Sequence, residues 1–365
     1  MATTIPSLAS YSLLGTSGLR VSPLCLGTMT FGTEWGWGVP PETAHAMLDR
    51  FVDSGGNFID TADLYTNGSS ERIVGAWLHE RKQRERVVLA TKFTFNMDRT
   101  ANPNAGGNGR KNILRAVDAS LGRLGTDYID LYWLHCWDQV TPVEEVLATL
   151  DSLVRAGKVR AVGLSDVPAW YAARAVTLAG ERGLERPCAL QLEYSLIERS
   201  IEHEHVPLAR ELGLGITPWS PLAAGLLTGK HKRGAGETKV EGEGRLKVVE
   251  KSTAPAWLRL FRERNWQIAD VVVDVAREIG CTPAQAALSF IARRPGVQST
   301  IVGATSVAQL DDNLKALEVK IPPALWQRLD DVSRLEPAHP YAMYDAGNAK
   351  MINGGTSVTK KPEWY

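Results

Sequence analysis

The feature that most constrains the fold of this chain is a repeat, in which a short apolar run is followed by a polar turn and then by an amphipathic helical pattern. An apolar run of four to eight residues bounded by turn residues is typical of a buried β-strand. The eight candidate strands are CLGTM (25–29), NFIDTA (57–62), RVVLATKF (86–93), YIDLYWLH (128–135), VRAVGLS (159–165), CALQLEYS (188–195), LGITPWS (214–220) and STIVGA (299–304).

Between these runs, apolar residues recur three and four positions apart, which is the spacing of one face of an α-helix. Glycines end many of these patterns just before the next strand, and glycine readily adopts the left-handed conformation of a helix C-terminal cap. The clearest helical sets are Ala44, Met47, Leu48, Phe51 and Val52; Val143, Val146, Leu147, Leu150 and Val154; and Ile268, Val271, Val272, Val275 and Ile279. The glycines that end helical patterns are Gly55, Gly125, Gly157, Gly183, Gly213 and Gly280.

Strands that alternate with helices pair in parallel through right-handed crossovers. Eight of them close into an α/β fold of the (β/α)8 TIM-barrel type. The main rival is a doubly wound open sheet, but no G-x-G-x-x-G pattern follows the first strand. A length of 365 residues suits either two domains or one large barrel. The repeat favours a single barrel domain spanning residues 1–365.

Three segments fall outside the repeat. YSLLGTSGLRVSP (11–23) has two short runs around Gly-Thr-Ser-Gly, which predicts a β-hairpin that covers the bottom of the barrel. Residues 228–256 are rich in Gly, Lys, Arg and Glu and are expected to form a long loop between the seventh and eighth units. An extra helix and a tail over 336–365 are expected to follow the barrel, with the tail on its surface.

Composition and charge argue against several classes of partner. Hydrophobic residues make up 44% of the chain and charged residues 22%, which is ordinary for a soluble protein. Lys plus Arg (41) balance Asp plus Glu (41), so the chain has no net charge that would attract it to nucleic acid or to a membrane surface.

The cysteines at 25, 136, 188 and 281 lack C-x-x-C spacing, which indicates reduced thiols. With no signal-peptide pattern and no membrane-length apolar run, we expect a cytoplasmic location.

Polar side chains follow strands two, three and four at the end where barrel active sites form. Asp60 and Tyr65 lie in NFIDTADLY (57–65), Lys92 ends strand three, and His135 ends strand four. A free phenol has a pKa near ~10, too high for acid–base work near neutral pH, and an adjacent ammonium lowers it. A carboxylate keeps a buried lysine charged, and a histidine can donate a hydrogen bond to a carbonyl oxygen on which negative charge develops. The set predicts a tyrosine proton donor.

The motifs that carry these residues resemble those of the aldo-keto reductases. FIDTADLY (58–65), ATK (90–92) and LH (134–135) are similar to the catalytic tetrad of that family. The resemblance extends over about residues 11 to 335 and includes GLS (163–165), QLEYS (191–195), PWSPLAAGLLTGK (218–230) and IVGATSVAQLDDN (301–313). Each motif is weak alone, but the ordered set is specific. The set resembles the branch of the family that includes bacterial aldo-keto reductases and potassium-channel β subunits.

This resemblance implies an NADP(H)-dependent oxidoreductase that interconverts aldehydes or ketones and alcohols. Tyr65 would be the general acid, Lys92 would tune it, and Asp60 would pair with Lys92. His135 would orient and polarise the substrate carbonyl. A hydride would pass from a reduced nicotinamide to the carbonyl carbon while Tyr65 protonates the oxygen.

The resemblance also implies a cofactor site. Trp219 would stack on the nicotinamide ring, and Ser165, Asp166 and Gln191 would engage its carboxamide. Family members often have asparagine where Asp166 stands, and an ionised aspartate accepts hydrogen bonds but cannot donate them. The remaining contacts would come from Thr28 and Met29 near the nicotinamide ribose, Ser220, Leu222 and Gly225 along the pyrophosphate, and Gly303, Thr305, Gln309 and Asn313 at the adenine end, and Asp60 would also contact the cofactor.

Cofactor preference depends on a 2′-phosphate contact. Many family members have lysine or arginine at the position of Thr305, and that cation is missing here. Lys230 and Arg245, in the 228–256 segment, match basic residues that embrace the phosphate in the channel β subunits. The resemblance therefore favours NADP(H), with NAD(H) as the alternative.

Aromatic residues next to the strand ends are candidates for a substrate pocket. Trp35 and Trp37 follow strand one, Phe93 follows Lys92, and Trp137 follows His135. Aromatic walls suit a hydrophobic or ring-bearing carbonyl compound. The loop 97–110, with NPNAGGNG, is a candidate flap.

Other interpretations of these residues remain. Asp60 could cap a turn, Tyr65 could be a packed aromatic, and Trp219 could belong to the core, although the ordered combination of these residues argues against such purely structural roles.

His203 and His205 are two positions apart and diverge on a helix, so no metal site is expected. A regulatory or redox-sensor subunit with slow turnover, acting through a protein partner, is the main functional alternative. A hydrolase with paired carboxylates is disfavoured. The physiological substrate, the direction of reaction and the oligomeric state are not legible.

Overall fold

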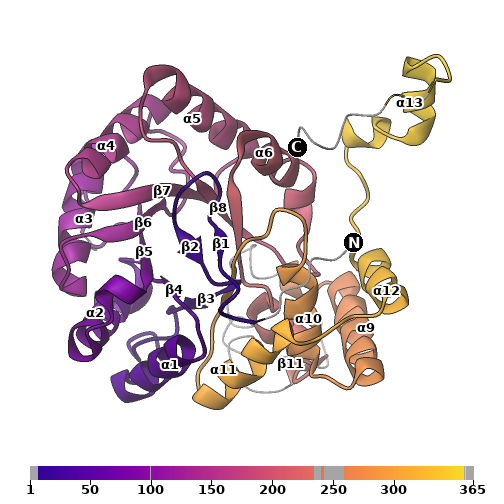
Figure 1. Ribbon diagram of the computed structural model, residues 1–365, viewed down its shortest axis with the longest axis horizontal. Helices are drawn as coiled ribbons and strands as arrows, with labels where there is room; N and C mark the ends of the chain where they lie inside the picture. Colours follow the sequence, from indigo (N-terminus) through magenta and orange to yellow (C-terminus); the bar gives the residue numbers. More distant parts are fainter. Residues whose placement is uncertain (1–6, 99, 234–239, 242–258, 357, 359–365) are drawn as a thin grey trace.

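Eight parallel strands form the centre of the structure, and helices surround them (Figure 1). The structure is a computed structural model that describes residues 7–98, 100–233, 240–241, 259–356 and 358. All eight candidate strands are present, as β3 (Leu24–Gly27), β4 (Phe58–Asp60), β5 (Val88–Phe93), β6 (Ile129–Leu134), β7 (Val159–Ser165), β8 (Ala189–Glu193), β9 (Gly215–Trp219) and β12 (Thr300–Val302).

The strands follow one another around the barrel in the order β12-β3-β4-β5-β6-β7-β8-β9. β12 pairs in parallel with β3, with Thr300 opposite Leu24. Between β9 and β12 the ring is closed by an isolated parallel bridge from Ile216 to Val297. The predicted (β/α)8 barrel is therefore confirmed, and all of its strand C-terminal ends lie at one face.

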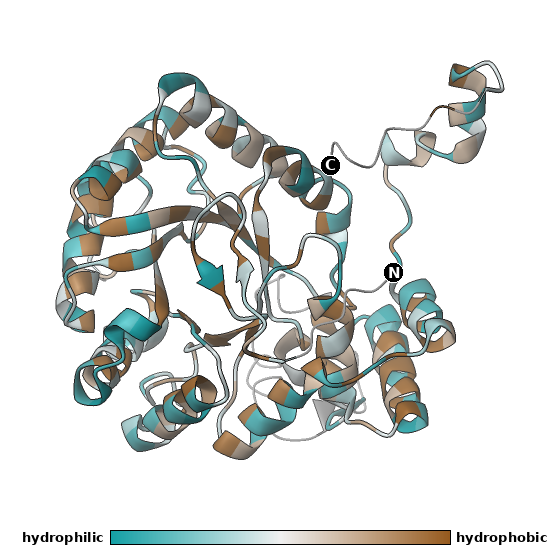
Figure 2. Cartoon of the chain, in the orientation of Figure 1, coloured by the Kyte–Doolittle hydropathy of each residue, from teal (hydrophilic) through white to brown (hydrophobic). Residues whose placement is uncertain are grey.

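The amphipathic patterns form the helices that the spacing predicts. Their apolar stripes are brown in Figure 2 and face the strands, while teal polar residues face outward. Gly125, Gly183, Gly213 and Gly280 cap helices in the left-handed conformation, with φ of 62°, 62°, 73° and 81°. The helices are α1 (Pro41–Asp53), α2 (Ser69–Arg81), α3 (Arg110–Leu124), α4 (Val143–Arg155), α5 (Ala169–Arg182), α6 (His205–Leu212), α9 (Glu263–Ile279), α10 (Pro283–Ala292), α11 (Val307–Leu314), α12 (Pro323–Ser333) and α13 (Ala346–Ile352).

The predicted N-terminal hairpin is present and covers the bottom of the barrel. Its strands β1 (Ser12–Leu13) and β2 (Arg20–Val21) pair antiparallel. Leu14 and Val21 are fully buried and belong to one apolar cluster with Cys25, Phe58 and Trp133 from the barrel strands. Because the bottom and the middle of the barrel are filled with apolar side chains, polar chemistry is confined to the opposite face.

The long loop and the C-terminal tail are described only in part. β10 (Lys232–Arg233) and β11 (Val240–Glu241) pair antiparallel within the 228–256 segment. In the tail, Tyr341 stacks on His203 and donates a hydrogen bond of 2.5 Å to Glu204. Beyond this contact, α13 stands away from the ring of helices (Figure 1). The tail therefore touches the surface near the start of α6 and then departs from it.

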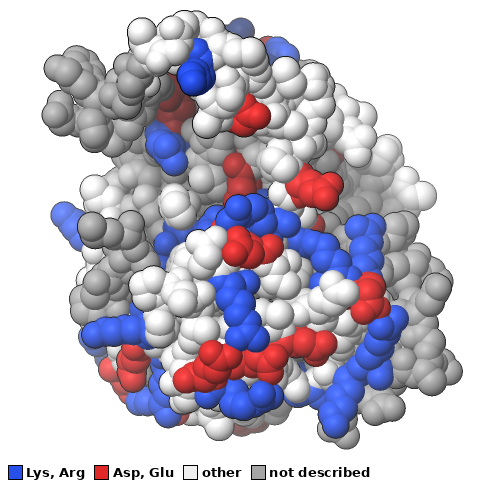
Figure 3. Space-filling view, turned by 90° about the vertical axis from the view of Figure 1, so that its right-hand side faces the viewer, with Lys and Arg blue, Asp and Glu red and all other residues white. Residues whose placement is uncertain are grey.

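The surface carries charges of both signs. Figure 3 shows basic and acidic side chains interspersed on the face that carries α9 and α12. Ion pairs on these helices include Arg277–Asp274 at 3.0 Å and Arg328–Glu278 at 2.6 Å. Among the helices of the described residues, none combines the length and apolar character needed to cross a membrane.

Candidate active site

The barrel brings the four tetrad residues together at the C-terminal ends of neighbouring strands. Asp60 ends β4 opposite Ala90 of β5, and Lys92 lies on β5 opposite Trp133 of β6. His135 directly follows β6, and its backbone N–H donates to the Phe93 carbonyl at 3.0 Å.

Tyr65 reaches the same point from the turn that follows β4. It begins a single helical turn, Tyr65–Gly68, whose next two residues, Thr66 and Asn67, have φ of 44° and 58°. Left-handed backbone is unusual for a threonine. The buried Thr66 hydroxyl donates to the Phe31 carbonyl at 2.6 Å, which holds this turn in place.

Lys92 is fully buried and uses all three of its ammonium hydrogens within the protein. It forms a salt bridge with the Asp60 carboxylate, and it donates to the Thr61 carbonyl at 2.9 Å and to the Tyr65 hydroxyl at 3.0 Å. Burial alone would lower the pKa of Lys92, but the Asp60 carboxylate and the Tyr65 oxygen outweigh it, so this pKa is raised. The lysine therefore stays charged while it contacts the phenol.

His135 is positioned as a neutral imidazole beside Tyr65. The two rings are edge to face, with centroids 6.0 Å apart. Burial, followed by the positive charge of Lys92, holds the pKa of His135 well below its usual range. A neutral imidazole has one donor and one acceptor nitrogen. It can donate one hydrogen bond to a carbonyl oxygen near Tyr65 without competing for the proton.

The residues expected around a nicotinamide carboxamide also converge. Gln191 donates to the second oxygen of Asp60 at 2.9 Å, which joins it to the tetrad. The Trp219 indole N–H donates to Asp166 Oδ1 at 3.0 Å. The Ser165 hydroxyl is buried and has no hydrogen bond of good geometry among the described residues, although it lies close enough to the Asp166 carboxyl to stabilise the ionised form of that group. Polar side chains that converge at one buried place suit a polar group of a ligand, so this group of residues fits a polar carboxamide.

Asp166 has an unusual conformation and an unusual acidity. It directly follows β7 with φ of 45°. Burial raises the pKa of Asp166 to about 7; the hydrogen bond from Trp219 opposes this shift and the nearby charge of Glu193 adds to it. Asp166, Glu193, Cys136 and Trp137 line one hollow beside the tetrad.

The residues expected along the ribose and the pyrophosphate differ in their exposure and in their backbone conformation. The Thr28 hydroxyl is buried and hydrogen-bonded to the Asp60 carbonyl at 3.1 Å and to Ser70 at 2.8 Å, so it is engaged within the protein. Met29 and Leu222 are partly exposed. Ser220 and Gly225 have left-handed backbones, with φ of 53° and 100°.

At the expected adenine end, four residues lie between the end of β12 and the last turn of α11. Gln309 accepts from the Thr305 backbone N–H at 2.9 Å and from the Thr305 hydroxyl at 2.8 Å. Asn313 donates to the Gly303 carbonyl at 3.2 Å. Lys230 is exposed, with its carbon chain beside Gly225, whereas Arg245 lies outside the described residues.

Aromatic side chains line the approach to the tetrad. Trp35 lies 5.7 Å from Trp37 and 6.5 Å from Tyr65 between ring centroids. Phe95, which no sequence motif marks, stands edge to face with His135, with ring centroids 4.9 Å apart. Trp137 packs against Trp170 at 5.4 Å on the side of the hollow next to Asp166.

The assignment of Phe93 to the substrate pocket is wrong. Its ring is fully buried and packs against Tyr132 at 4.9 Å, among residues of the outer core between barrel and helices. Side chains alternate along a strand, so Lys92 facing the barrel interior turns Phe93 toward the helices. Phe95, two residues further on, has the exposed position that was assigned to Phe93.

A second carboxylate cluster lies behind the tetrad. Glu71 is fully buried and accepts from Thr91 at 2.6 Å and from Arg123 at 2.6 Å. Asp63 is buried beside it, and its Oδ1 has no hydrogen-bond partner among the described residues. Burial, followed by the charge of Glu71, raises the pKa of Asp63 to about 8. Its surroundings therefore favour the neutral, protonated form of Asp63.

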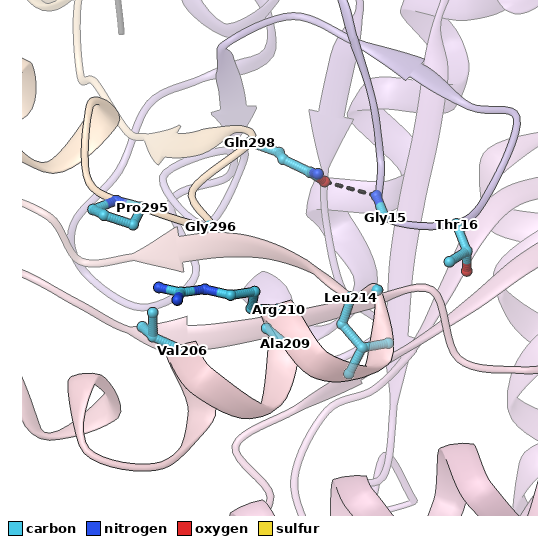
Figure 4. A pocket seen from close by; sticks show the side chains of 10 residues that line it. Gly15, Thr16, Val206, Ala209, Arg210, Leu214, Pro295, Gly296 and Gln298 are labelled. Carbon is cyan, nitrogen blue, oxygen red and sulfur yellow. Dashed lines mark hydrogen bonds between the residues drawn. The ribbon is translucent and has the colours of Figure 1, made fainter. Parts of the chain in front are cut away.

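Another hollow lies at the opposite end of the barrel and does not contain the predicted site residues. It is lined by the hairpin at Gly15 and Thr16, by Arg210 of α6 and by the Pro295–Gln298 turn (Figure 4). The Gln298 side chain accepts from the Gly15 backbone N–H at 2.7 Å and ties the hairpin to this turn. Across the described ranges, no group of three or more His, Cys, Asp or Glu side chains is arranged to hold a metal ion.

Comparison with known proteins gives a consistent result. The model of the aldo/keto reductase family matches residues 23–334. The chain is 36% identical to the norsolorinic acid reductase stcV of Emericella nidulans, over 92% of this chain and 85% of that protein. It is also 36% identical to the uncharacterized oxidoreductase YrpG of Bacillus subtilis, over 88% of this chain and 95% of that protein. An aryl-alcohol dehydrogenase [NADP(+)] of Phanerodontia chrysosporium is 33% identical, over 91% of this chain and 87% of that protein.

Proposed function

The chain belongs to the aldo/keto reductase family, and on that premise we propose that it is an NADP(H)-dependent reductase of aldehydes or ketones whose substrates carry an aromatic ring. The family and the oxidoreductases among its relatives support an enzyme of carbonyl chemistry. The choice of cofactor, the proton donor and the substrate class are the parts that we propose.

The observation that carries the proposal is the position of Lys92 between Asp60 and Tyr65. A hydrogen bond from an ammonium favours the ionised form of its acceptor, so the 3.0 Å contact helps Tyr65 to give up its proton. The Asp60 salt bridge keeps the lysine charged in a fully buried position. Tyr65 would thus protonate the carbonyl oxygen as reduction proceeds, which is general acid catalysis.

His135 would act on the same oxygen. A neutral imidazole donor beside Tyr65 can hold the carbonyl oxygen and stabilise the negative charge that develops there. A reduced nicotinamide, when bound, supplies the hydride for the carbonyl carbon. The cofactor's nicotinamide end would be held by four polar or aromatic side chains that gather beside the tetrad, Ser165, Asp166, Gln191 and Trp219.

Two observations support an aromatic substrate. Trp35, Trp37 and Phe95 line the approach to Tyr65 and His135, and aromatic rings favour edge-to-face and offset contacts with other rings. The relative from Phanerodontia chrysosporium is named an aryl-alcohol dehydrogenase, and an aryl alcohol carries an aromatic ring. An aromatic aldehyde or ketone is therefore the substrate class that we propose.

The test is a titration of the protein with NADPH and with NADH, followed by tryptophan fluorescence. Tighter binding of NADPH supports the cofactor assignment, and the Lys230→Ala, Arg245→Ala double variant should lose that preference. Equal binding of both nucleotides would contradict the phosphate contact while leaving the reductase intact. Steady turnover of an aromatic aldehyde separates an enzyme from the alternative of a slow sensor subunit, which would bind NADPH but turn over poorly.

A further inference from the structure

We propose that Asp166 links a proton to the oxidation state of the bound cofactor, so that its neutral carboxyl favours NADPH and its ionised carboxylate favours NADP+. This inference rests on the proposed function, since it concerns the nicotinamide end of the same site. It assigns to Asp166 a binding role that an asparagine at this position could not have.

The backbone fixes Asp166 at the site. Its N–H donates to the Gln191 carbonyl at 3.2 Å, and its carbonyl accepts from the Trp137 N–H at 3.4 Å. Its φ of 45° lies in the left-handed region, where aspartate and asparagine are the best tolerated residues after glycine. Asp166→Asn should therefore keep the backbone conformation and replace the ionisable carboxyl with an amide that does not titrate.

The side chain of Asp166 has no cation to neutralise it. None of the ion pairs between described residues includes Asp166, and the nearby Lys92 is already engaged by Asp60. The Trp219 indole supplies one neutral donor to Oδ1 at 3.0 Å. The titratable and polar groups that face Asp166 from the packed elements are Lys92 on β5, Cys136 after β6, Ser165 on β7, Glu193 on β8 and Trp219 on β9.

This environment makes both protonation states accessible near neutral pH. A buried carboxylate without a paired cation is costly, and the like charge of Glu193 makes ionisation harder still. Together they raise the pKa of Asp166 to about 7. His135 does not titrate in the same range, because burial and Lys92 hold its pKa well below the usual value.

The two protonation states suit different forms of the cofactor. A neutral carboxyl can donate to a carboxamide oxygen and still accept from Trp219, whereas a carboxylate only accepts. The nicotinamide ring is neutral when reduced and positively charged when oxidised, so a carboxylate beside it attracts only the oxidised form. Binding of NADPH would take up a proton from solvent near neutral pH, and binding of NADP+ would release one. No covalent bond other than the O–H bond of Asp166 changes.

The experiment measures the dissociation constants of NADPH and NADP+ by titration calorimetry on both sides of neutral pH. In the wild type, NADPH should bind more weakly and NADP+ more tightly as pH rises, by at most about tenfold per pH unit for one linked proton. In Asp166→Asn, this opposite pH dependence should vanish. The 2′-phosphate of the cofactor also titrates, but it does so in both proteins, so the difference between them isolates Asp166.

Glu193→Gln is the matched second variant. Removal of its negative charge makes Asp166 easier to ionise, so the midpoint of the opposite pH dependence should move to lower pH. Wild type and Asp166→Asn with the same pH dependence would overturn the inference while leaving the proposed function intact. Once the pH dependence of Asp166→Asn has been subtracted, a shift of both cofactors in the same direction would also overturn it. Absence of binding of either cofactor to either protein would overturn the proposed function, and this inference with it.

Discussion

The Lys92 ammonium contacts the Tyr65 hydroxyl at 3.0 Å while it is held in a buried salt bridge with Asp60. The three residues come from two adjacent strands and the turn after one of them, so the barrel itself sets their spacing. A charged lysine at this position has two consequences. The charge favours the ionised form of the Tyr65 hydroxyl. It also makes the stability of the site depend on the presence of both members of the ion pair.

We predict that Lys92→Met lowers the free energy of unfolding by about 3–5 kcal/mol, because Asp60 is left as a buried charge without its partner. The double variant Asp60→Asn, Lys92→Met should recover most of this stability, since it removes both charges. Both variants should lack reductase activity, because both lack Lys92. Urea denaturation and NADPH oxidation measure the two effects. A double variant that is no more stable than Lys92→Met would contradict the ion-pair account.

Asp63 makes the stability depend on pH in a direction opposite to that of most carboxylates. Its pKa is raised to about 8 in the folded state by burial, against an unfolded value near ~3.9. The folded protein therefore holds this proton more tightly, so the contribution of Asp63 to stability is full below the unfolded pKa and is lost as pH rises toward 8.

We expect Asp63→Asn to abolish this loss. The free energy of unfolding of the wild type should fall relative to that of the variant, by several kcal/mol, as pH rises from about 4 to about 8, and the difference should then stay constant. Denaturant unfolding of both proteins across this range is the measurement. A difference that does not vary with pH would mean that Asp63 is ionised in the folded protein.

Phe95 and Phe93 are two residues apart but differ in exposure, so alanine substitutions at the two positions can be compared directly. Phe95 is 39% exposed and contacts His135, whereas Phe93 is fully buried. Phe95→Ala should raise the KM for an aromatic aldehyde about threefold to tenfold, with little change in unfolding, because it removes one aromatic contact. Phe93→Ala should lower the free energy of unfolding by about 3–5 kcal/mol through the cavity that it leaves. A larger rise in KM for Phe93→Ala than for Phe95→Ala would reverse this assignment.

The strands and the tetrad could be predicted from the sequence because each depends on a local pattern. Apolar runs bounded by glycine turns gave all eight strands, and the motifs around Asp60, Lys92 and His135 fall at strand ends where a parallel barrel must bring them together. The same alternation along β5 could have excluded Phe93 and drawn attention to Phe95. The choice of Phe95 over Phe93 depends on knowing that Lys92 faces the barrel interior.

Other features depend on contacts that no local pattern reports. The bond from Trp219 to Asp166 joins the ends of two strands that are separated in the barrel by β8. The Thr28 hydroxyl is hydrogen-bonded to Ser70 and to the Asp60 carbonyl, which only the folded structure brings near. The acidity of Asp166 follows from burial and from Glu193, so it too requires the three-dimensional arrangement.

The most direct test of the central claim is the rate of reduction of an aromatic aldehyde by Tyr65→Phe, measured with the affinity of the same variant for NADPH. Phenylalanine keeps the ring over which the Lys92 ammonium lies, at 4.6 Å from its centroid, and removes only the hydroxyl. We predict that kcat/KM falls by about 10²–10⁴, while NADPH binds as tightly as it does to the wild type. A variant that binds NADPH and reduces the aldehyde within about threefold of the wild-type rate would show that Tyr65 is not the proton donor.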